Sequence, residues 1–153
     1  MKNILITGGA GYIGSHVTEV LIKNKKKIFI VDNLITGFKK LVNNKTKFYK
    51  ADILDTKKMN QIIINNNIDS IIHLAGSLVI RIGEKNPKSY YKNNVLGTNS
   101  ILLACKGTSV KNFIFSSTAA VYKDNQKTVN EKSKIGPKSV YGKTKLKAEK
   151  LII

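Results

Sequence analysis

A glycine-rich segment, Gly8–Gly14, lies between a short apolar run and a stretch with helical spacing. Glycines at every third position, Gly8, Gly11 and Gly14, allow a tight turn, a close approach of the backbone to a phosphate, and close packing of helix on strand. The free N–H groups that open the helix, with the positive end of its dipole, favour an anion there. A glycine trio alone also occurs in ordinary turns. A strand, this turn and a helix in that order predict a dinucleotide-binding unit.

Short β-branched runs alternate with longer helical stretches along the rest of the chain. Continuous apolar runs of this kind are typical of strands buried on both faces of a parallel sheet. The predicted strands are 3–7, 27–31, 46–50, 69–74 and 112–116, and the predicted helices lie near 12–24, 55–66, 87–107 and 139–153. The alternation predicts an α/β fold: a Rossmann-like, doubly wound parallel sheet with helices on both faces.

Local signals refine these boundaries. Pro87 suits the first turn of a helix, where a missing N–H costs nothing, and Asp55 is a typical N-cap for the helix that follows it. The polar, basic segment 123–138 is expected to be a loop.

Length and composition limit the class of protein. With 153 residues, 42% of them hydrophobic, the chain is long enough for one compact domain, and we expect residues 1–153 to form it. No apolar run approaches the roughly 18 residues of a membrane span, and the N-terminal run is too short for a signal peptide. The single cysteine, Cys105, excludes an intrachain disulfide and a cysteine-cluster metal site. We therefore expect a soluble, cytoplasmic protein with no metal and no membrane contact.

The net charge of +18 first suggests nucleic acid as a partner. Arg81 is the only arginine, however, and arginine is the preferred residue for bidentate recognition of phosphates and bases. The lysines are spread along the whole chain, and asparagine and isoleucine are abundant too, which indicates a codon-level bias. No nucleic-acid partner is therefore expected, and a basic nucleic-acid-binding domain is the weakest alternative.

An acidic residue ends the second predicted strand. A carboxylate at Asp32 can accept hydrogen bonds from the hydroxyls of an adenosine ribose and repels a 2′-phosphate, which favours NAD over NADP. Asp32 and Asn33 would also serve as an ordinary turn. Lys39 and Lys40, nearby, are the feature that would admit a 2′-phosphate.

A tyrosine and a lysine stand four residues apart in the last predicted helix. Tyr141 and Lys145 would share one helix face, where the ammonium lowers the phenol pKa from its usual value near 10. Such a pair can remove a hydroxyl proton while a nicotinamide takes the hydride. In a lysine-rich chain the spacing also arises by chance on a solvated face. Hydroxyls at Ser116–Thr118, after the fifth strand, would bind a substrate oxygen beside the tyrosine or simply form a turn.

Seven blocks in a fixed order resemble the N-terminal part of the extended short-chain dehydrogenases/reductases, in the NAD-dependent epimerase/dehydratase family. The resemblance is greatest to the nucleotide-sugar epimerases typified by UDP-glucose 4-epimerase. The blocks are TGGAGYIGSH at 7–16, DNL at 32–34, DI at 52–53, HLAG at 73–76, YYKNNV at 90–95, FSSTAAVY at 115–122 and YGKTK at 141–145.

The resemblance implies a role for each matching residue and a reaction. NAD would be bound by Gly8, Gly11, Tyr12, Ile13 and Gly14 at the pyrophosphate, Asp32 and Asn33 at the ribose, Asp52 and Ile53 at the adenine, and Leu74, Ala75 and Gly76 at the nicotinamide; Asn94 would support the active-site helix, and Thr118, Tyr141 and Lys145 would be catalytic. The implied reaction is transient oxidation at C4 of a nucleotide-sugar by tightly bound NAD, followed by return of the hydride to the opposite face. Members of this family often form homodimers through paired helices, and the stretches near 87–107 and 139–153 would be the candidates in this chain.

Several positions depart from the family pattern. Ala119 and Ala120 replace the Asp-Glu pair of sugar 4,6-dehydratases, which removes the acid–base pair of that reaction. Lys25 stands where glycine usually follows the first helix, and Leu78 where the best-known hexose epimerases have a lysine. Family members continue beyond the helix that ends this chain, so we expect the C-terminal substrate domain to be absent and activity to be weak or lost. The alternatives are another NAD-dependent nucleotide-sugar epimerase or reductase, and a non-catalytic dinucleotide-binding fragment.

Overall fold

The computed structural model describes residues 1–123 and 128–153. They form two compact units. The first unit comprises Met1–Ala75 and Ser100–Ser116, and the second comprises Gly76–Asn99 and Ser117–Ile153. Residues 124–127 of the expected loop lie outside the described residues.

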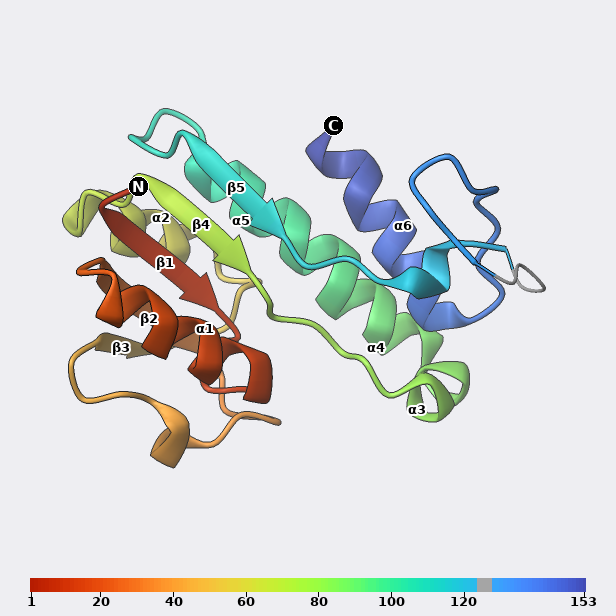
Figure 1. The fold of residues 1–153 in the computed structure, drawn as a ribbon, viewed down its shortest axis with the longest axis horizontal. Coiled ribbons are helices and arrows are strands. Elements are labelled where there is room, and N and C mark those ends of the chain that lie inside the picture. Colours follow the sequence, from red (N-terminus) through yellow and green to blue (C-terminus); the bar gives the residue numbers. More distant parts are fainter. Residues whose placement is uncertain (124–127) are drawn as a thin grey trace. The chain divides into compact units, whose positions relative to one another are not determined.

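A five-stranded sheet forms the centre of the first unit (Figure 1). Its strands are β1 (Asn3–Thr7), β2 (Lys27–Asp32), β3 (Lys47–Lys50), β4 (Ser70–His73) and β5 (Asn112–Phe115). Every pair is parallel, in the order β3-β2-β1-β4-β5. The parallel α/β sheet predicted from the apolar runs is confirmed. All carboxyl ends of the strands consequently lie at one edge, where ligands bind in open sheets of this kind.

Helices cover both faces of this sheet. The helix α1 (Tyr12–Lys23) packs Val17 and Leu21 against Ile4, Ile30 and their neighbours on one face. On the other face, α2 (Thr56–Asn65) and the part of α5 (Gly97–Cys105) that belongs to the first unit pack against a second cluster. Burying both faces explains why the strands read as continuous apolar runs instead of alternating ones.

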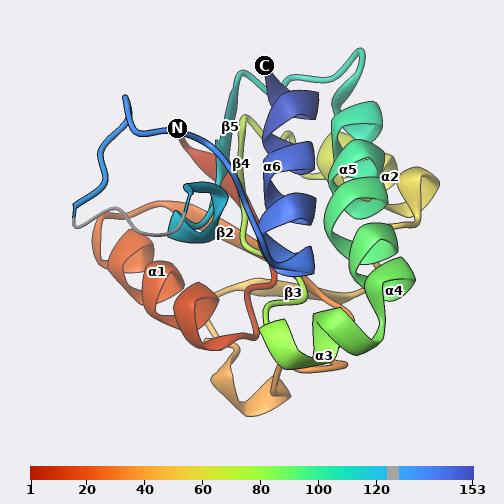
Figure 2. The ribbon, with the colours of Figure 1, turned by 90° about the vertical axis from the view of Figure 1, so that its right-hand side faces the viewer.

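The second unit is mainly helical. It contains α3 (Ile80–Lys85), α4 (Pro87–Tyr91), a π-helical turn η2 (Lys92–Leu96), a 3-10 turn η3 (Ala119–Val121) and α6 (Val140–Ile152). The helices α3, α4 and α6 contact one another (Figure 2). A further 3-10 turn, η1 (Lys39–Leu41), belongs to the first unit.

The predicted helix near 87–107 is divided in the structure. It begins at Pro87 as expected, but η2 interrupts it before α5 continues to Cys105. The helix α3 was not predicted at all, because its apolar run shows no clear helical spacing. The predicted cap at Asp55 is confirmed, since its carboxylate accepts the Lys58 N–H at 2.9 Å.

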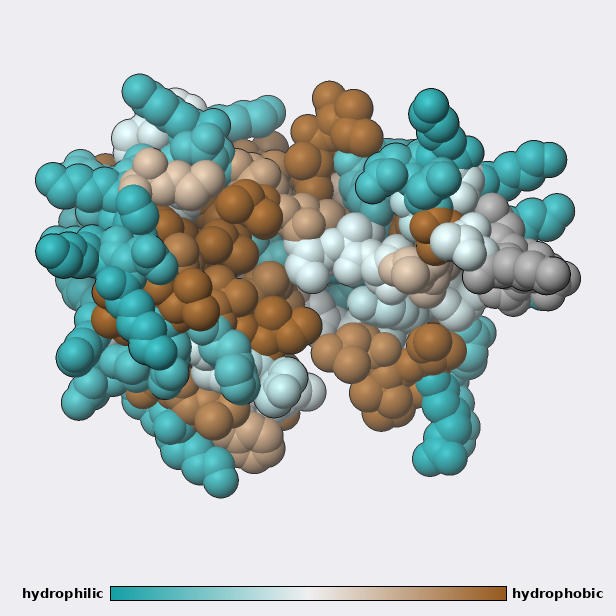
Figure 3. All heavy atoms as spheres, viewed as in Figure 1, coloured by the Kyte–Doolittle hydropathy of each residue, from teal (hydrophilic) through white to brown (hydrophobic). Residues whose placement is uncertain are grey.

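The surface of the molecule has hydrophilic and apolar areas. Hydrophilic side chains extend from several sides of the first unit on the face drawn in Figure 3, around an apolar centre. None of the helices within 1–123 and 128–153 has the length and apolar character needed to cross a bilayer.

Candidate functional site

The glycine turn is packed so tightly that side chains would not fit. A Cβ on Gly14 would lie 2.4 Å from the Gly8 carbonyl oxygen, and one on Gly8 would lie 2.7 Å from the Ala75 nitrogen. Gly8 also has φ of +73°, which disfavours any residue with a Cβ. The turn between β1 and α1 therefore requires glycine at both positions, as the sequence pattern predicts.

The beginning of α1 is open to an anion. Gly11 is the N-cap and supplies no side chain, and the first turn contains no acidic residue. The Ser15 N–H donates to the Gly11 carbonyl oxygen at 3.0 Å, so the N–H groups before it have no acceptor within the helix. Tyr12 and Ile13 are 78% and 58% exposed. Free donors, a helix dipole and a side-chain-free turn fit a pyrophosphate.

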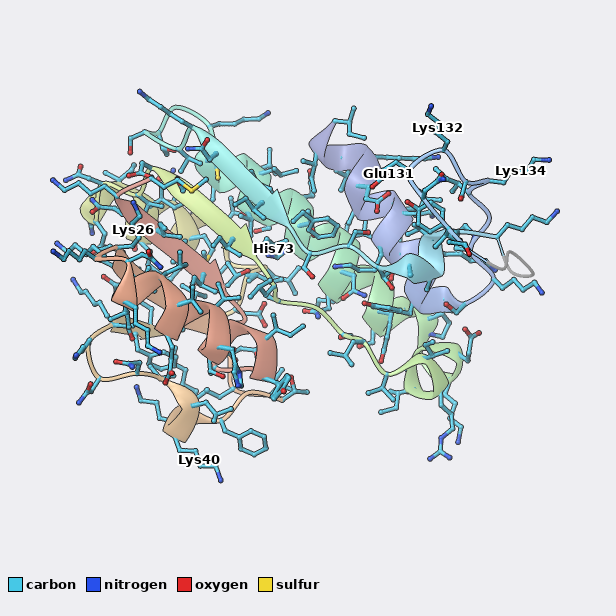
Figure 4. The ribbon with its side chains drawn as sticks, in the orientation of Figure 1. Lys26, Lys40, His73, Glu131, Lys132 and Lys134 are labelled. Atoms are coloured by element: carbon cyan, nitrogen blue, oxygen red, sulfur yellow. The ribbon has the colours of Figure 1, made fainter. Side chains whose placement is uncertain are left out.

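Asp32 lies at the end of β2, where its carboxylate is held by the backbone. One oxygen accepts the Ala10 N–H at 3.1 Å and the other accepts the Leu34 N–H at 2.8 Å. A Cβ on Gly37 would lie 2.8 Å from the same carboxylate, so the loop closes over it. Each oxygen keeps a lone pair for a ribose hydroxyl. The side chain of Lys40 points away from the ribbon (Figure 4).

Asp52 and Ile53, the two residues expected at the adenine, have different surroundings. Asp52 accepts the Asn33 side-chain amide at 3.3 Å and the Leu54 N–H at 2.9 Å. Ile53 is 4% exposed and belongs to the core cluster beside α2. A contact from Ile53 to an adenine would accordingly use its backbone, because its side chain is already packed.

The end of β4 is tied to the end of β1. The Leu74 N–H donates to the Thr7 carbonyl oxygen at 3.0 Å, and Thr7 Oγ1 lies 2.5 Å from His73 Nδ1. His73 is fully buried at the carboxyl end of β4 (Figure 4) and stacks on Phe115. His73 is thus a core residue that fixes the two strand ends, and Leu74 and Ala75 follow directly.

Asn94 is the central residue of η2 in the second unit. It is 2% exposed, and its carboxamide accepts the Ser77 N–H at 2.7 Å and donates to the Ser77 carbonyl oxygen at 2.9 Å. The same amide also donates to Thr144 Oγ1 on α6 at 3.1 Å. Asn94 therefore joins the segment after Gly76 to α6, within a π-helical turn, a feature that is frequent at functional sites.

Tyr141 and Lys145 lie four residues apart on α6, one turn from each other. Tyr141 is partly exposed, whereas Lys145 is 6% exposed. Burial lowers the pKa of Lys145 to about 8, and the negative charge of Glu149 acts in the opposite direction. The Lys145 ammonium therefore loses its proton far more readily than that of an exposed lysine.

Thr118 is the N-cap of η3, where its Oγ1 accepts the Ala120 N–H at 3.2 Å. The turn packs closely on the beginning of α6, since a Cβ on Gly142 would lie 2.4 Å from the Ala120 carbonyl oxygen. The sequence brings all three expected catalytic residues into the second unit, on α6 and on the turn packed against it.

Two acidic residues around α6, Glu84 and Glu149, were not predicted, and the Ser117 hydroxyl, expected at a substrate oxygen or in a turn, binds one of them. Ser117 donates a short hydrogen bond to the Glu149 carboxylate, and Glu84 of α3 accepts the Val140 N–H at 2.7 Å. Glu149 had one available signal, its place four residues after Lys145. Within the described residues, no three His, Cys, Asp or Glu side chains gather as a metal site requires.

Comparisons with known proteins give one family. The profile of the "NAD dependent epimerase/dehydratase family" matches residues 4–153. A UDP-glucose 4-epimerase of Lactobacillus helveticus is 39% identical over 150 residues, which are 97% of this chain and 46% of that protein. The chain spans about half the length of the curated relatives it matches.

Solved structures agree with this result. The UDP-glucose 4-epimerase of Thermotoga maritima, solved with UDP-glucose, is similar with a TM-score of 0.93 and 36% identity, over 98% of this chain and 50% of that one. The UDP-glucose 4-epimerase of Brucella ovis, solved in complex with NAD, is similar with a TM-score of 0.94 and 36% identity. The match covers 99% of this chain and 46% of that one.

Proposed function

Because the chain belongs to the NAD dependent epimerase/dehydratase family, we propose that it is the NAD-binding part of a nucleotide-sugar 4-epimerase of the UDP-glucose/UDP-galactose type. The observation that carries the proposal is the second unit's arrangement of Tyr141 and a buried Lys145 on α6, with the turn of Thr118 packed on the same helix.

The first unit supplies the proposed binding of the nucleotide. The N–H groups of Tyr12 and Ile13 would bind the pyrophosphate, and Asp32, with Asn33 beside it, would accept the ribose hydroxyls. Asp52 and the Ile53 backbone would contact the adenine. NAD, when bound, supplies a reversible acceptor for the hydride of a sugar carbon. The residues proposed for its nicotinamide end are Leu74, Ala75, Gly76, Tyr141 and Lys145.

The proposed chemistry at the sugar uses the phenol of Tyr141. The phenol oxygen, one helix turn from Lys145, would take the proton of the C4 hydroxyl as a general base. The Thr118 hydroxyl would donate to or accept from the same sugar oxygen and hold it in place. Returning the proton from Tyr141 as the hydride returns leaves no net oxidation.

The residues next to Thr118 help to distinguish the proposed 4-epimerase from its alternatives. Ala119 and Ala120 form η3 directly after Thr118, where elimination of water would need carboxylates, so a 4,6-dehydratase is disfavoured. Another NAD-dependent nucleotide-sugar epimerase or reductase is the alternative on the same fold, and its turnover of a different nucleotide-sugar would identify it. A non-catalytic dinucleotide-binding fragment would bind NAD through the first unit and show no turnover.

We further propose a cytoplasmic protein that pairs as a homodimer through α4 and α6. Between these helices lies a surface hollow of about 320 Å³, lined by the apolar residues Pro87, Tyr91 and Val140 and also by Thr144, Lys88, Lys143 and Lys147. Apolar side chains exposed on neighbouring helices are typical of a subunit interface.

The experiment is an assay for interconversion of UDP-glucose and UDP-galactose by the protein that carries this chain, with the 153-residue chain alone in parallel. Tyr141→Phe should reduce turnover by at least about 100-fold, since a general base contributes that much, while NAD stays bound. Lys150→Gln, an exposed change on the same helix outside that hollow, is the control. Unchanged turnover in Tyr141→Phe would contradict the catalytic assignment, and NAD binding without any interconversion would favour the fragment.

A further inference from the structure

The segment that carries Thr118 is fixed to α6 on both sides of that residue. On one side, the Ser117 hydroxyl donates a short hydrogen bond to the Glu149 carboxylate. On the other, the Ala120 carbonyl oxygen lies so close to Gly142 that a Cβ would reach within 2.4 Å of it. Thr118 lies between these two attachments, so its position relative to α6 depends on both.

Glu149 also lies one turn after Lys145, on the same stretch of α6. Residues four apart on a helix face each other, so the carboxylate is close enough for its charge to raise the pKa of the buried ammonium. Among the other charged or titratable groups near α6, Tyr141 lies on the same helix one turn earlier, Tyr90 of α4 interacts with Tyr141, and Glu84 of α3 binds the N–H of Val140. The charge of Glu149 raises the pKa of Lys145.

We propose that Glu149 is a positioning residue of the active site. Its carboxylate holds Ser117 on α6 and so fixes the position of Thr118 relative to Tyr141 and Lys145. This inference rests on the proposed function, which gives those three residues their catalytic roles. Glu149 touches neither cofactor nor sugar in this scheme and acts through Ser117 and Lys145.

Three substitutions separate the hydrogen bond from the charge. Glu149→Gln keeps an oxygen that accepts from Ser117 but removes the charge, Glu149→Ala removes both, and Ser117→Ala removes only the donor. Glu19→Gln, which removes an exposed carboxylate on α1, is the matched control for net charge.

The first measurement is amide hydrogen exchange of Ala120 and Val121, whose N–H groups both bond to Thr118. The loss of a hydrogen bond to a charged group should speed local opening of this turn by roughly tenfold or more. We expect this acceleration in Ser117→Ala and Glu149→Ala, and a smaller one in Glu149→Gln. Exchange as slow as in the wild type for both Ser117→Ala and Glu149→Ala would overturn the proposal.

The second measurement is the titration of Lys145 by NMR of the chain with labelled lysine, its signal identified by its loss in Lys145→Arg. An ammonium that loses a neighbouring anion gives up its proton more readily, so Glu149→Gln should lower the pKa of Lys145 below its value of about 8. Ser117→Ala and Glu19→Gln, which keep the Glu149 charge, should not lower it. A Glu149→Gln titration that coincides with the wild type would refute the part played by the charge.

Neither readout uses cofactor or sugar, which separates this inference from the proposed function. If the exchange and the titration change as expected but the protein shows no epimerase turnover, the proposed reaction is wrong. The attachment of Ser117 to α6 would still be supported. In an active protein, Glu149→Gln should also move the alkaline limb of the pH profile of kcat to lower pH, because Lys145 is then deprotonated earlier. An unmoved alkaline limb would count against the role of Glu149 at the active site.

Discussion

Lys25 has a backbone φ of +56°, in the left-handed region that glycine prefers. Its N–H donates to the Ile22 carbonyl oxygen at 2.9 Å, and the next N–H donates to Leu21 at 3.1 Å, so these bonds close the end of α1. A residue with a Cβ costs about 1 kcal/mol there. The strand β2 begins at Lys27, so the chain turns within two residues, and Lys25 adopts the strained backbone conformation of that turn.

Lys25→Gly should therefore stabilise the chain by up to about 1 kcal/mol, since it relieves the left-handed strain. The measurement is the urea midpoint, or a melting temperature raised by about 2–4 °C. Lys26→Gly removes the same charge at the neighbouring residue, where φ is not positive, and should not increase the stability. Equal stabilisation by both substitutions would indicate that charge, and not backbone strain, is responsible.

At the scale of elements, the contact between η3 and α6 decides where the proposed catalytic residues lie. Gly142 is helical, so helix propensity alone would favour alanine there by about 1 kcal/mol. The Ala120 carbonyl oxygen, at 2.4 Å from a Cβ, and Pro137, at 3.0 Å, leave no room for it. A backbone carbonyl cannot rotate away, so the two elements would have to separate.

Gly142→Ala should consequently destabilise the chain by about 1–3 kcal/mol, the opposite sign from propensity. The measurement is the free energy of unfolding in urea, with Lys143→Ala, the exposed next residue of α6, as the control. A stabilised Gly142→Ala variant would show that η3 and α6 do not pack this closely.

The elements also show what a single sequence can predict. Strand positions and the main helices followed from buried apolar runs, and the residues of the candidate site followed from motif blocks at strand and helix ends. The π-helical turn did not, because it depends on a tertiary contact: the buried Asn94 amide binds the backbone of Ser77, far along the chain. The pairing of Ser117 with Glu149 was missed for the same reason, since it exists only once η3 lies on α6.

At the scale of the whole molecule, the net charge of +18 complicates any test of cofactor choice. A positively charged protein attracts every anion, and it attracts NADP more strongly than NAD because NADP has an extra phosphate. The carboxylate of Asp32, held by Ala10 and Leu34, opposes that attraction at one place only. Salt at about 0.15 M screens exposed charges beyond about 8 Å, so the local effect of Asp32 should then dominate.

In such salt, NAD should raise the melting temperature of the chain more than NADP at equal concentration, because a ligand that binds the folded state stabilises it. Thermal shift measurements in both cofactors check this. Asp32→Asn removes the charge that repels the 2′-phosphate and should narrow the difference. Equal shifts from NAD and NADP in the wild type would argue against Asp32 as the residue that selects between them.

The two edges of the sheet differ in a way that bears on how copies of the chain behave when concentrated. At one edge, β3 has exposed lysines at both ends, Lys47 and Lys50, and like charges keep such an edge from pairing with another copy. At the other, β5 reads Asn-Phe-Ile-Phe without a charge, leaves Ile114 45% exposed, and is bonded to β4 alone among the described strands. Association beyond the proposed dimer would then use the edge of β5. Because strongly cationic molecules repel one another, such association should require enough salt to screen that repulsion.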